Sequence, residues 1–308
     1  MLDKIEGLRS LNTNVYIIQT SVLSKYQALN HFLIEHHPEA AVEVRDNYIH
    51  VMRQYYLEHF SAYYHGLKKL EQAAGDKGDL VGYEEAQRTY FFGSAKPTVK
   101  DKRNVFNIGT RLEVLGRPSD NSGDSGHGEQ AIILSLAQEA NKTILFEELF
   151  KNYLLALVDN AINEYRFITN FFLSSHARNR SASNEMAAMI FDHIFEPPIV
   201  IGKNCVKQHV ELSVDLLGML LVIRLVDSCG KAETRRAAVD IPAVRAFLDS
   251  VTALVWPRAK EAIELHIKSI RRLGAKSRTT KLDAHPHTAS HSMHMKVSVW
   301  RPAEGQGN

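Results

Sequence analysis

Cysteine is scarce in this sequence, whose 308 residues include only Cys205 and Cys229. Two cysteines without metal-ligand spacing exclude a zinc module and a disulfide framework, and they favour a reducing compartment. An excess of charge of either sign is also lacking, because 37 Lys and Arg residues stand against 35 Asp and Glu residues. Since a nucleic-acid-binding domain usually presents a basic face, this balance argues against nucleic acid as a partner.

Long apolar runs are missing as well. The most apolar stretch, LLGMLLVIRLV at residues 216–226, is bracketed by aspartates and broken by Arg224. A membrane-spanning helix needs about 20 apolar residues, so this stretch predicts a buried helix instead. Asn12 and Asn14 interrupt the first apolar segment, which is therefore not typical of a secretory signal.

Motifs for catalysis are equally sparse, with no phosphate-binding loop, no HExxH and no CxxC. The segment GDSGHG at residues 123–128 resembles the loop around the nucleophile of chymotrypsin-like serine proteases, which makes Ser125 a remote candidate nucleophile. That chemistry requires a histidine base and a buried aspartate on a double β-barrel, whereas this chain reads as helical where the barrels would lie. The tail contains four clustered histidines, a composition that can bind metal. No predicted element holds their side chains in a fixed arrangement, so a specific metal site is not expected. They are His285, His287, His291 and His294. We therefore predict a protein without a catalytic residue, a cofactor or a metal site.

Apolar residues at helical spacing are abundant. They make up 44% of the sequence against 23% charged residues, a composition typical of a globular chain. Their period of 3.6 residues predicts an all-α protein, elongated or bundled, with an irregular insertion. The first predicted helix ends at Pro38. Five more predicted helices follow, at residues 42–72, 143–173, 185–195, 200–228 and 242–273. Thr143 is expected to cap the third helix, and Pro197 with Pro198 to end the fourth.

The predicted insertion lies between residues 75 and 142, where glycine, proline, serine and aspartate become frequent. Its segment NVFNIGTRLEVL, residues 104–115, has the propensity for one or two short strands. Residues 119–129 are expected to form a flexible loop, because they have little apolar surface to bury. The segment AIILSLAQEA, residues 131–140, predicts a short helix.

The first helix carries a candidate partner-binding seam. With Leu8 at position a of a heptad, seven of eight a and d positions are apolar, and only Lys25 breaks the pattern. A seam this narrow is typical of coiled-coil or bundle packing, and its covering helix is expected within this chain or in another subunit. The seam residues are Leu8, Leu11, Val15, Ile18, Val22, Leu29 and Phe32.

Aromatic residues mark two further helix faces. Tyrosines between residues 48 and 64 form a stripe that predicts core packing, with hydroxyls reaching the surface, in preference to the stacking of nucleic-acid bases. The last predicted helix includes Pro257, which disturbs the backbone ladder, so we expect two helical segments to meet there with Trp256 buried at their joint. The apolar stripe of that helix comprises Trp256, Ala259, Ile263, Ile267 and Ile270.

Several stretches of the chain resemble one protein family. They are TNVYIIQTSVLSKYQALNHFL, VRDNYIHVMRQYYLEHFSAYYHGLKKLE, DLVG with a following FF, NVFNIGTR, FEELFKNYLLALVDNAINEYRFITNFF, WPRAKEAIELHIKSIR and LDAHPH. They span most of residues 4–287, and in order and spacing they resemble the vacuolar protein sorting fifty-two subunit of the Golgi-associated retrograde protein (GARP) tethering complex. None of them is a catalytic signature.

The resemblance implies a helical bundle of the multisubunit-tether type without enzymatic activity. It implies a subunit that acts with other GARP subunits and those of a related endosomal tether, and that contacts SNAREs and Rab-family GTPases. The implied task is the capture of endosome-derived vesicles at the trans-Golgi network, by a cytosolic protein with peripheral, indirect membrane association. A helical scaffold with other partners is the alternative, and a serine hydrolase using Ser125 is a remote one.

Four regions follow from these patterns. They are a coiled-coil-like helical hairpin at 1–74, the irregular insertion at 75–142, a helical bundle at 143–287 and a divergent, disordered tail at 288–308. The tail begins after His287, where the family continues with a tyrosine- and arginine-rich segment. The chain also starts after most of the family's N-terminal coiled coil. These two departures indicate a truncated, alternatively spliced or mispredicted product, and they bear on its assembly.

Overall fold

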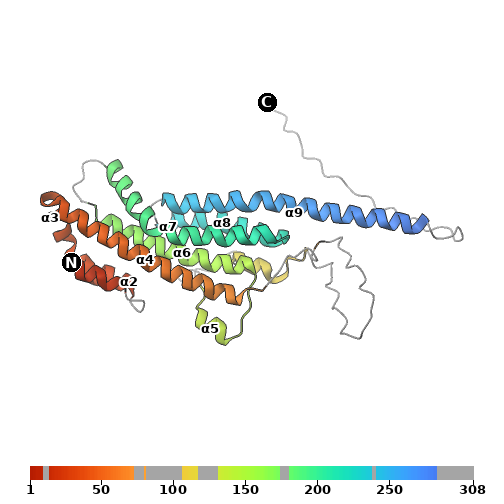
Figure 1. The fold of residues 1–308 in the computed structure, drawn as a ribbon, viewed down its shortest axis with the longest axis horizontal. Coiled ribbons are helices and arrows are strands. Elements are labelled where there is room, and N and C mark those ends of the chain that lie inside the picture. Colours follow the sequence, from red (N-terminus) through yellow and green to blue (C-terminus); the bar gives the residue numbers. More distant parts are fainter. Residues whose placement is uncertain are drawn as a thin grey trace, which may run out of the picture.

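Five long helices form an elongated bundle in the computed structural model (Figure 1). The structure describes residues 1–9, 14–72, 80, 106–116, 131–173, 180–237 and 241–282, and every regular element within these ranges is helical. This confirms the predicted all-α fold. The long helices are α4 (Pro38–Leu70), α6 (Phe146–Phe171), α7 (Arg180–Leu212), α8 (Leu216–Ala237) and α9 (Pro242–Leu282).

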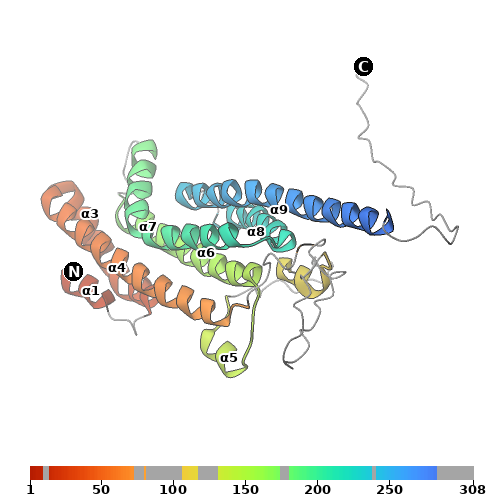
Figure 2. The same ribbon diagram turned by 45° about the vertical axis from the view of Figure 1, so that its right-hand side comes forward.

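The helices are layered across the bundle. Helix α7 contacts both α4 and α9, while α6 contacts α4, α7 and α8, so α6 and α7 occupy the middle. The view turned by 45° shows the same order, with α4 near the N-terminal segment and α9 on the opposite side (Figure 2). Because α6 has neighbours on several sides, its apolar residues cover more than one face.

The N-terminal segment is a chain of short helical pieces, so the prediction of one regular helix up to Pro38 was wrong. A π-helical turn at Ile18–Val22 precedes a 3₁₀ turn at Leu23–Tyr26, and both change the number of residues per turn. A heptad seam requires a constant period, so these turns rotate its later positions away from the earlier ones. The pieces are α1 (Leu2–Glu6), η1 (Gly7–Arg9), α2 (Val15–Ile17), η2 (Ile18–Val22), η3 (Leu23–Tyr26) and α3 (Gln27–His36).

The prolines differ in whether they end a helix. Helix α3 ends at His36, just before Pro38, as the sequence predicted. Pro38 occupies the first turn of α4, where its missing N–H is not needed. Helix α7 continues through Pro197 and Pro198, and α9 continues through Pro257, so the predicted end and joint at these positions were wrong. In α7 the carbonyl of His193, whose usual donor would be the N–H of residue 197, accepts a hydrogen bond from Arg53 Nη1 at 2.7 Å.

The break between α7 and α8 lies instead at residues 213–215, inside the helix predicted over 200–228. Asp215 stabilises the start of α8, because its Oδ1 accepts a hydrogen bond from the backbone N–H of Gly218 at 3.1 Å. Ser213 Oγ in turn accepts from the N–H of Asp215 at 3.0 Å. Ser213 and Asp215 therefore act as helix-start signals. They set the boundary between α7 and α8 within a stretch that is otherwise apolar.

The described part of the insertion is helical rather than extended. Gly109–Leu115 forms the 3₁₀ helix η6, so the predicted strand character of this segment was wrong. Helix α5 (Leu134–Glu139) confirms the predicted short helix. Helix α6 begins after Leu145, so Thr143 is not its cap. The predicted loop 119–129 and the tail 288–308 lie outside the described residues.

Candidate functional site

The candidate seam is divided by the structure. Leu8 and Val15 are buried in the main core, and Ile18 and Val22 are half-buried. Leu29 and Phe32 on α3 are 47% and 50% exposed, so none of the described elements covers them fully. Leu11 lies outside the described residues. The first half of the seam therefore packs the N-terminal segment onto its own bundle, whereas Leu29 and Phe32 of the second half stay partly exposed.

A buried carboxylate joins the N-terminal segment to two long helices. Glu164 on α6 is completely buried and accepts hydrogen bonds from Tyr48 Oη at 2.6 Å, Gln19 Nε2 at 2.8 Å and Tyr56 Oη at 3.0 Å. Burial raises the pKa of Glu164, and the three hydrogen bonds oppose that rise. Burial and the nearby carboxylate raise the pKa of both tyrosines. The group links η2, α4 and α6 at one point.

This hydrogen-bonded group corrects the prediction for the tyrosine stripe. Tyr48 and Tyr56 belong to the core as predicted, but their hydroxyls point to Glu164 and not to the surface. Tyr63 and Tyr64 are half-buried and come closer to the predicted arrangement. Glu164 itself was not singled out in the sequence, where it is one acidic residue among the mixed charges of a long helix.

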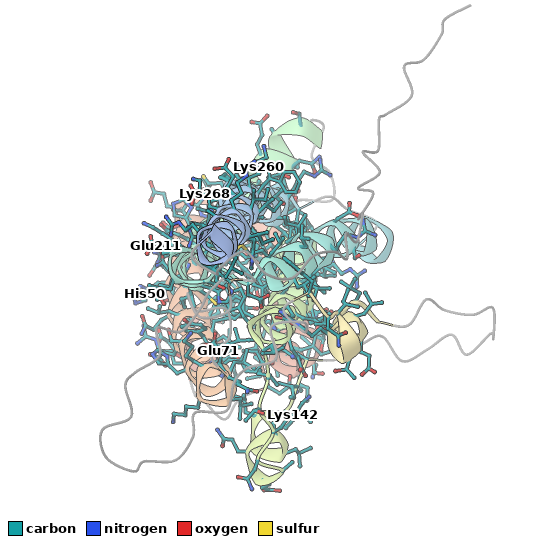
Figure 3. The ribbon with its side chains drawn as sticks, turned by 90° about the vertical axis from the view of Figure 1, so that its right-hand side faces the viewer. His50, Glu71, Lys142, Glu211, Lys260 and Lys268 are labelled. Atoms are coloured by element: carbon teal, nitrogen blue, oxygen red, sulfur yellow. The ribbon has the colours of Figure 1, made fainter. Side chains whose placement is uncertain are left out.

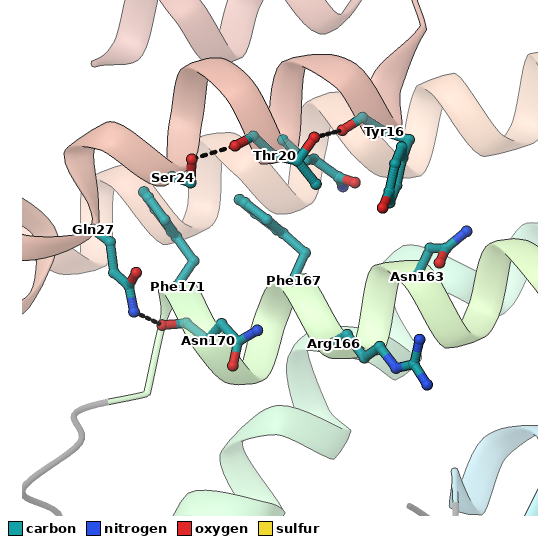
Figure 4. Close-up of a pocket in the computed structure, with 10 residues that line it drawn as sticks. Tyr16, Thr20, Ser24, Gln27, Asn163, Arg166, Phe167, Asn170 and Phe171 are labelled. Carbon is teal, nitrogen blue, oxygen red and sulfur yellow. Dashed lines mark hydrogen bonds between the residues drawn. The ribbon is translucent and has the colours of Figure 1, made fainter. Parts of the chain in front are cut away.

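A groove lies between the N-terminal segment and α6 (Figure 4), and Gln19, which donates to Glu164, is one of the residues that line it. Its volume is about 560 Å³, and amide, hydroxyl and aromatic side chains line it together with the guanidinium of Arg166. Thr20 Oγ1 donates to the carbonyl of Tyr16 at 2.7 Å, and Ser24 Oγ donates to the carbonyl of Thr20. Because these hydroxyls are bound to backbone carbonyls and no histidine lines the groove, it is suited to hydrogen bonding with a polar segment and has no nucleophile–base pair.

A second polar cluster fixes the insertion to the bundle. Arg111 on η6 donates from Nε to Glu147 Oε1 at 2.6 Å, and from Nη1 and Nη2 to the carboxylate of Asp215 at 3.1 and 2.5 Å. Burial opposes the charge of Arg111, but the hydrogen bonds from both carboxylates hold its pKa above the ordinary value. This bidentate arrangement connects η6 with the starts of α6 and α8.

The apolar stripe predicted around Trp256 lies on the outside of α9. Trp256 is 46% exposed, so its predicted burial at a helix joint was wrong. Ala259 is the one stripe member that faces the bundle, and Ala262, His266 and Ser269 share that buried face. Small side chains on this face let α9 approach its neighbours closely. The larger stripe members are turned away from it, because α9 continues straight through Pro257.

Polar contacts hold this inner face of α9 against the turn between α7 and α8. Arg258 donates from Nε and Nη2 to the carbonyl of Ser213, at 3.2 and 3.0 Å. His266 Nε2 lies 3.3 Å from the carbonyl oxygen of Val214. These contacts occupy the two carbonyls that the break between the helices leaves without helical donors.

The remaining sequence candidates are not assembled into a site. Ser125 and the four tail histidines lie outside the described residues. Within the described ranges, no three His, Cys, Asp or Glu side chains are placed to hold a metal ion. Among the helices that the structure describes, none has the length and hydrophobicity that a membrane crossing requires. Cys205 is buried and Cys229 half-buried, both as free thiols.

These features describe a class of protein, an elongated all-α bundle with apolar side chains exposed at α3 and α9. The family model described as Vps52, C-terminal, matches residues 50–296, which extends past His287. The chain therefore belongs to the Vps52 family. No solved structure matches it.

Three relatives illustrate the similarity. Vacuolar protein sorting-associated protein 52 A of Arabidopsis thaliana is 30% identical over 287 residues, which are 93% of this chain and 37% of the relative. The human homologue is 28% identical over 288 residues, with the same coverage of both chains. The Saccharomyces cerevisiae protein is 26% identical over 316 residues, 95% of this chain and 46% of the relative. The chain thus spans less than half the length of these relatives.

Proposed function

We propose that this chain acts as a noncatalytic subunit of a vesicle-tethering complex in retrograde transport from endosomes to the trans-Golgi network. Membership of the Vps52 family carries the proposal, because the matched relatives are named vacuolar protein sorting-associated proteins. The proposed partners are other GARP and endosomal-tether subunits, with SNAREs and Rab-family GTPases as further contacts. The proposed location is the cytosolic face of trans-Golgi and endosomal membranes, to which the protein attaches peripherally.

The arrangement of side chains supports action by protein–protein contact. Large apolar residues are exposed on helices at both sides of the bundle, Leu29 and Phe32 on α3 and Trp256 on α9. Exposed apolar patches of this kind on soluble proteins mark interaction sites. We further propose that α3 contributes to assembly and that the chain divides into the regions 1–74, 75–142, 143–287 and 288–308, of which 1–74 and 143–287 share one hydrophobic core.

Affinity purification of the chain, with identification of the bound proteins, tests the proposal. We expect the other GARP subunits to be recovered, and a full-length relative serves as the comparison. Recovery of an unrelated set of proteins would instead support a helical scaffold with other partners.

A double substitution tests the contribution of α3. Leu29→Asp with Phe32→Asp should reduce recovery of the subunits without a change in melting temperature, because both side chains are half-exposed in the isolated chain. The matched control is Leu136→Asp on α5, another exposed apolar position.

An active-serine probe that labels Ser125, but not a Ser125→Ala variant, would overturn the noncatalytic role.

A further inference from the structure

Helix α9 presents a continuous apolar stripe to solvent. Trp256, Ile263, Ile267 and Ile270 are each between 42% and 49% exposed. At 3.6 residues per turn they fall within about 60° of the helix circumference and extend over roughly 21 Å. Figure 1 shows that the C-terminal half of α9 continues beyond the ends of α7 and α8. The exposed stripe is therefore a separate face from the one that α9 packs on the bundle.

Basic side chains flank this stripe. Lys260 Nζ lies 5.5 Å from the centroid of the Trp256 ring, and Lys268 pairs with Glu264 at 3.7 Å. Figure 3, which looks along α9, shows Lys260 and Lys268 on its outer surface. Arg271 adds a third cation, about 40° from Ile267 on the helix circumference. Among the described side chains, neither Lys260 nor Arg271 has a carboxylate partner in the ion pairs of the structure.

We propose that this stripe binds an amphipathic α-helix of another polypeptide, with an apolar face bordered by aspartate and glutamate. The ridge of isoleucines spaced three, four and seven residues apart fits the ridge-and-groove packing of two helices. Acidic residues along the partner would neutralise Lys260 and Arg271 and would fix its orientation. The identity of the partner as another tether subunit rests on the proposed function, whereas the chemistry of the surface does not.

A second copy of this chain fits the stripe less well. Two copies related by a two-fold axis would place the same surface against itself. In an antiparallel pair, Lys260, Lys268 and Arg271 of one copy would lie beside the same three cations of the other, while Glu261 is already paired with Arg258 and Glu264 with Lys268. Like charges at close range disfavour that pairing and favour an acidic helix.

A peptide titration tests the proposal directly. The whole chain carries Trp300→Phe, so that Trp256 is the single tryptophan and its fluorescence reports on the stripe. One synthetic 21-residue peptide presents a leucine and isoleucine face bordered by glutamates, and a second has lysines in place of the glutamates. We expect the acidic peptide to shift Trp256 emission to shorter wavelength and to bind at least tenfold more tightly than the basic one.

Two sets of variants complete the test. Ile263→Ser with Ile267→Ser should weaken the acidic peptide at least tenfold at unchanged melting temperature, while the control Leu136→Ser on α5 should not. Lys260→Glu with Arg271→Glu should reverse the preference between the peptides. Equal binding of both peptides, no binding of either, or indifference to the isoleucine variants would overturn the proposal. A dimer in sedimentation that the isoleucine variants dissociate would overturn it in favour of a second copy.

The titration is independent of the proposed function. It uses the purified chain and defined peptides, so its failure concerns α9 alone. Failure of the proposed function would appear as a wild-type chain that recovers no tether subunit, whatever the peptides do.

Discussion

At the scale of single residues, buried polar groups hold this protein together at points that apolar packing alone would not specify. Glu164 is surrounded by neutral donors, and among the described residues no cation contacts it. A buried carboxylate without its donors is strongly destabilising, so each of the three hydrogen bonds matters more than a surface bond. His209 is a polar group of a different kind: the residue is half-buried, its Nε2 has no hydrogen-bond partner among the described residues, and its ring stacks on Phe146 at a centroid distance of 3.6 Å.

Removing one donor from Glu164 should destabilise the fold measurably. Tyr48→Phe leaves the carboxylate with two hydrogen bonds, and we expect the free energy of unfolding to fall by about 1–3 kcal/mol. Tyr55→Phe on the same helix is the control, because the Tyr55 hydroxyl lies near Glu164 without a hydrogen bond to it, and the substitution should have little effect. Urea unfolding followed by circular dichroism measures both. Equal effects of the two substitutions would contradict the assigned role of Glu164.

His209 should make stability depend on pH. Burial lowers its pKa to about 4, whereas the unfolded chain takes up the proton near pH 6.5. The stabilising contribution of the neutral ring is therefore complete above pH 6.5 and is lost as pH falls toward 4. From pH 7 to pH 5 the free energy of unfolding should fall by about 2 kcal/mol through this group.

His209→Phe retains the stacking on Phe146 and removes the titration, so it isolates this contribution. Unfolding in urea at pH 7 and pH 5 is the measurement, and the difference between wild type and variant should grow by about that amount at the lower pH. A variant with an unchanged pH dependence would show that other groups are responsible.

At the scale of helices, periodicity in the sequence predicted the elements better than their ends. The spans of α4, α6 and α9 were anticipated because their apolar residues repeat over many turns. The helix end predicted at Pro197 was wrong, because the His193 carbonyl that this proline leaves without a helical donor accepts a hydrogen bond from Arg53 on α4. That contact joins residues far apart in the sequence. Ser213 and Asp215 carried a readable start signal, which the surrounding apolar run obscured. The sequence identified the apolar stripe of α9. Periodicity does not show which side of a broad apolar stripe packs against another helix and which side is exposed to solvent.

The exposed position of Trp256 changes the expected effect of its removal. Trp256→Ala should lower the free energy of unfolding by less than about 1 kcal/mol, because half of the ring is already in water. Phe247→Ala, on the buried face of the same helix, should lower it by about 3–5 kcal/mol. Thermal melting of the two variants decides the matter. A similar large loss for Trp256→Ala would restore the joint predicted from the sequence.

At the scale of the whole molecule, separate parts of the chain are attached to the bundle by a few specific contacts. The N-terminal segment is held at Glu164, and η6 is held by Arg111. Neither attachment was predictable from the sequence, since each depends on side chains brought together only by the fold. Leu8 and Val15 in the candidate seam gave a partial signal, because their apolar character does mark where the N-terminal segment packs.

Cutting the attachment at Arg111 should release η6 while the bundle stays folded. Arg111→Met keeps much of the side-chain volume but leaves Glu147 and Asp215 without their shared cation. We expect faster amide exchange over Gly109–Leu115 and little change in α4. Hydrogen exchange with mass spectrometry gives both readings, and Arg224→Met at a surface ion pair is the control. Unchanged exchange in η6 would contradict the attachment.

The bond between Gln19 and Glu164 also sets an order of events during synthesis. The two residues are 145 positions apart. At about 5–20 residues per second, a ribosome needs roughly 7–30 s to add the second after the first. For that interval Val15 and Leu23, which end up buried, have no α6 to pack against. The newborn N-terminal segment can contact α4 first, but it lacks the helix that completes its packing until α6 leaves the exit tunnel.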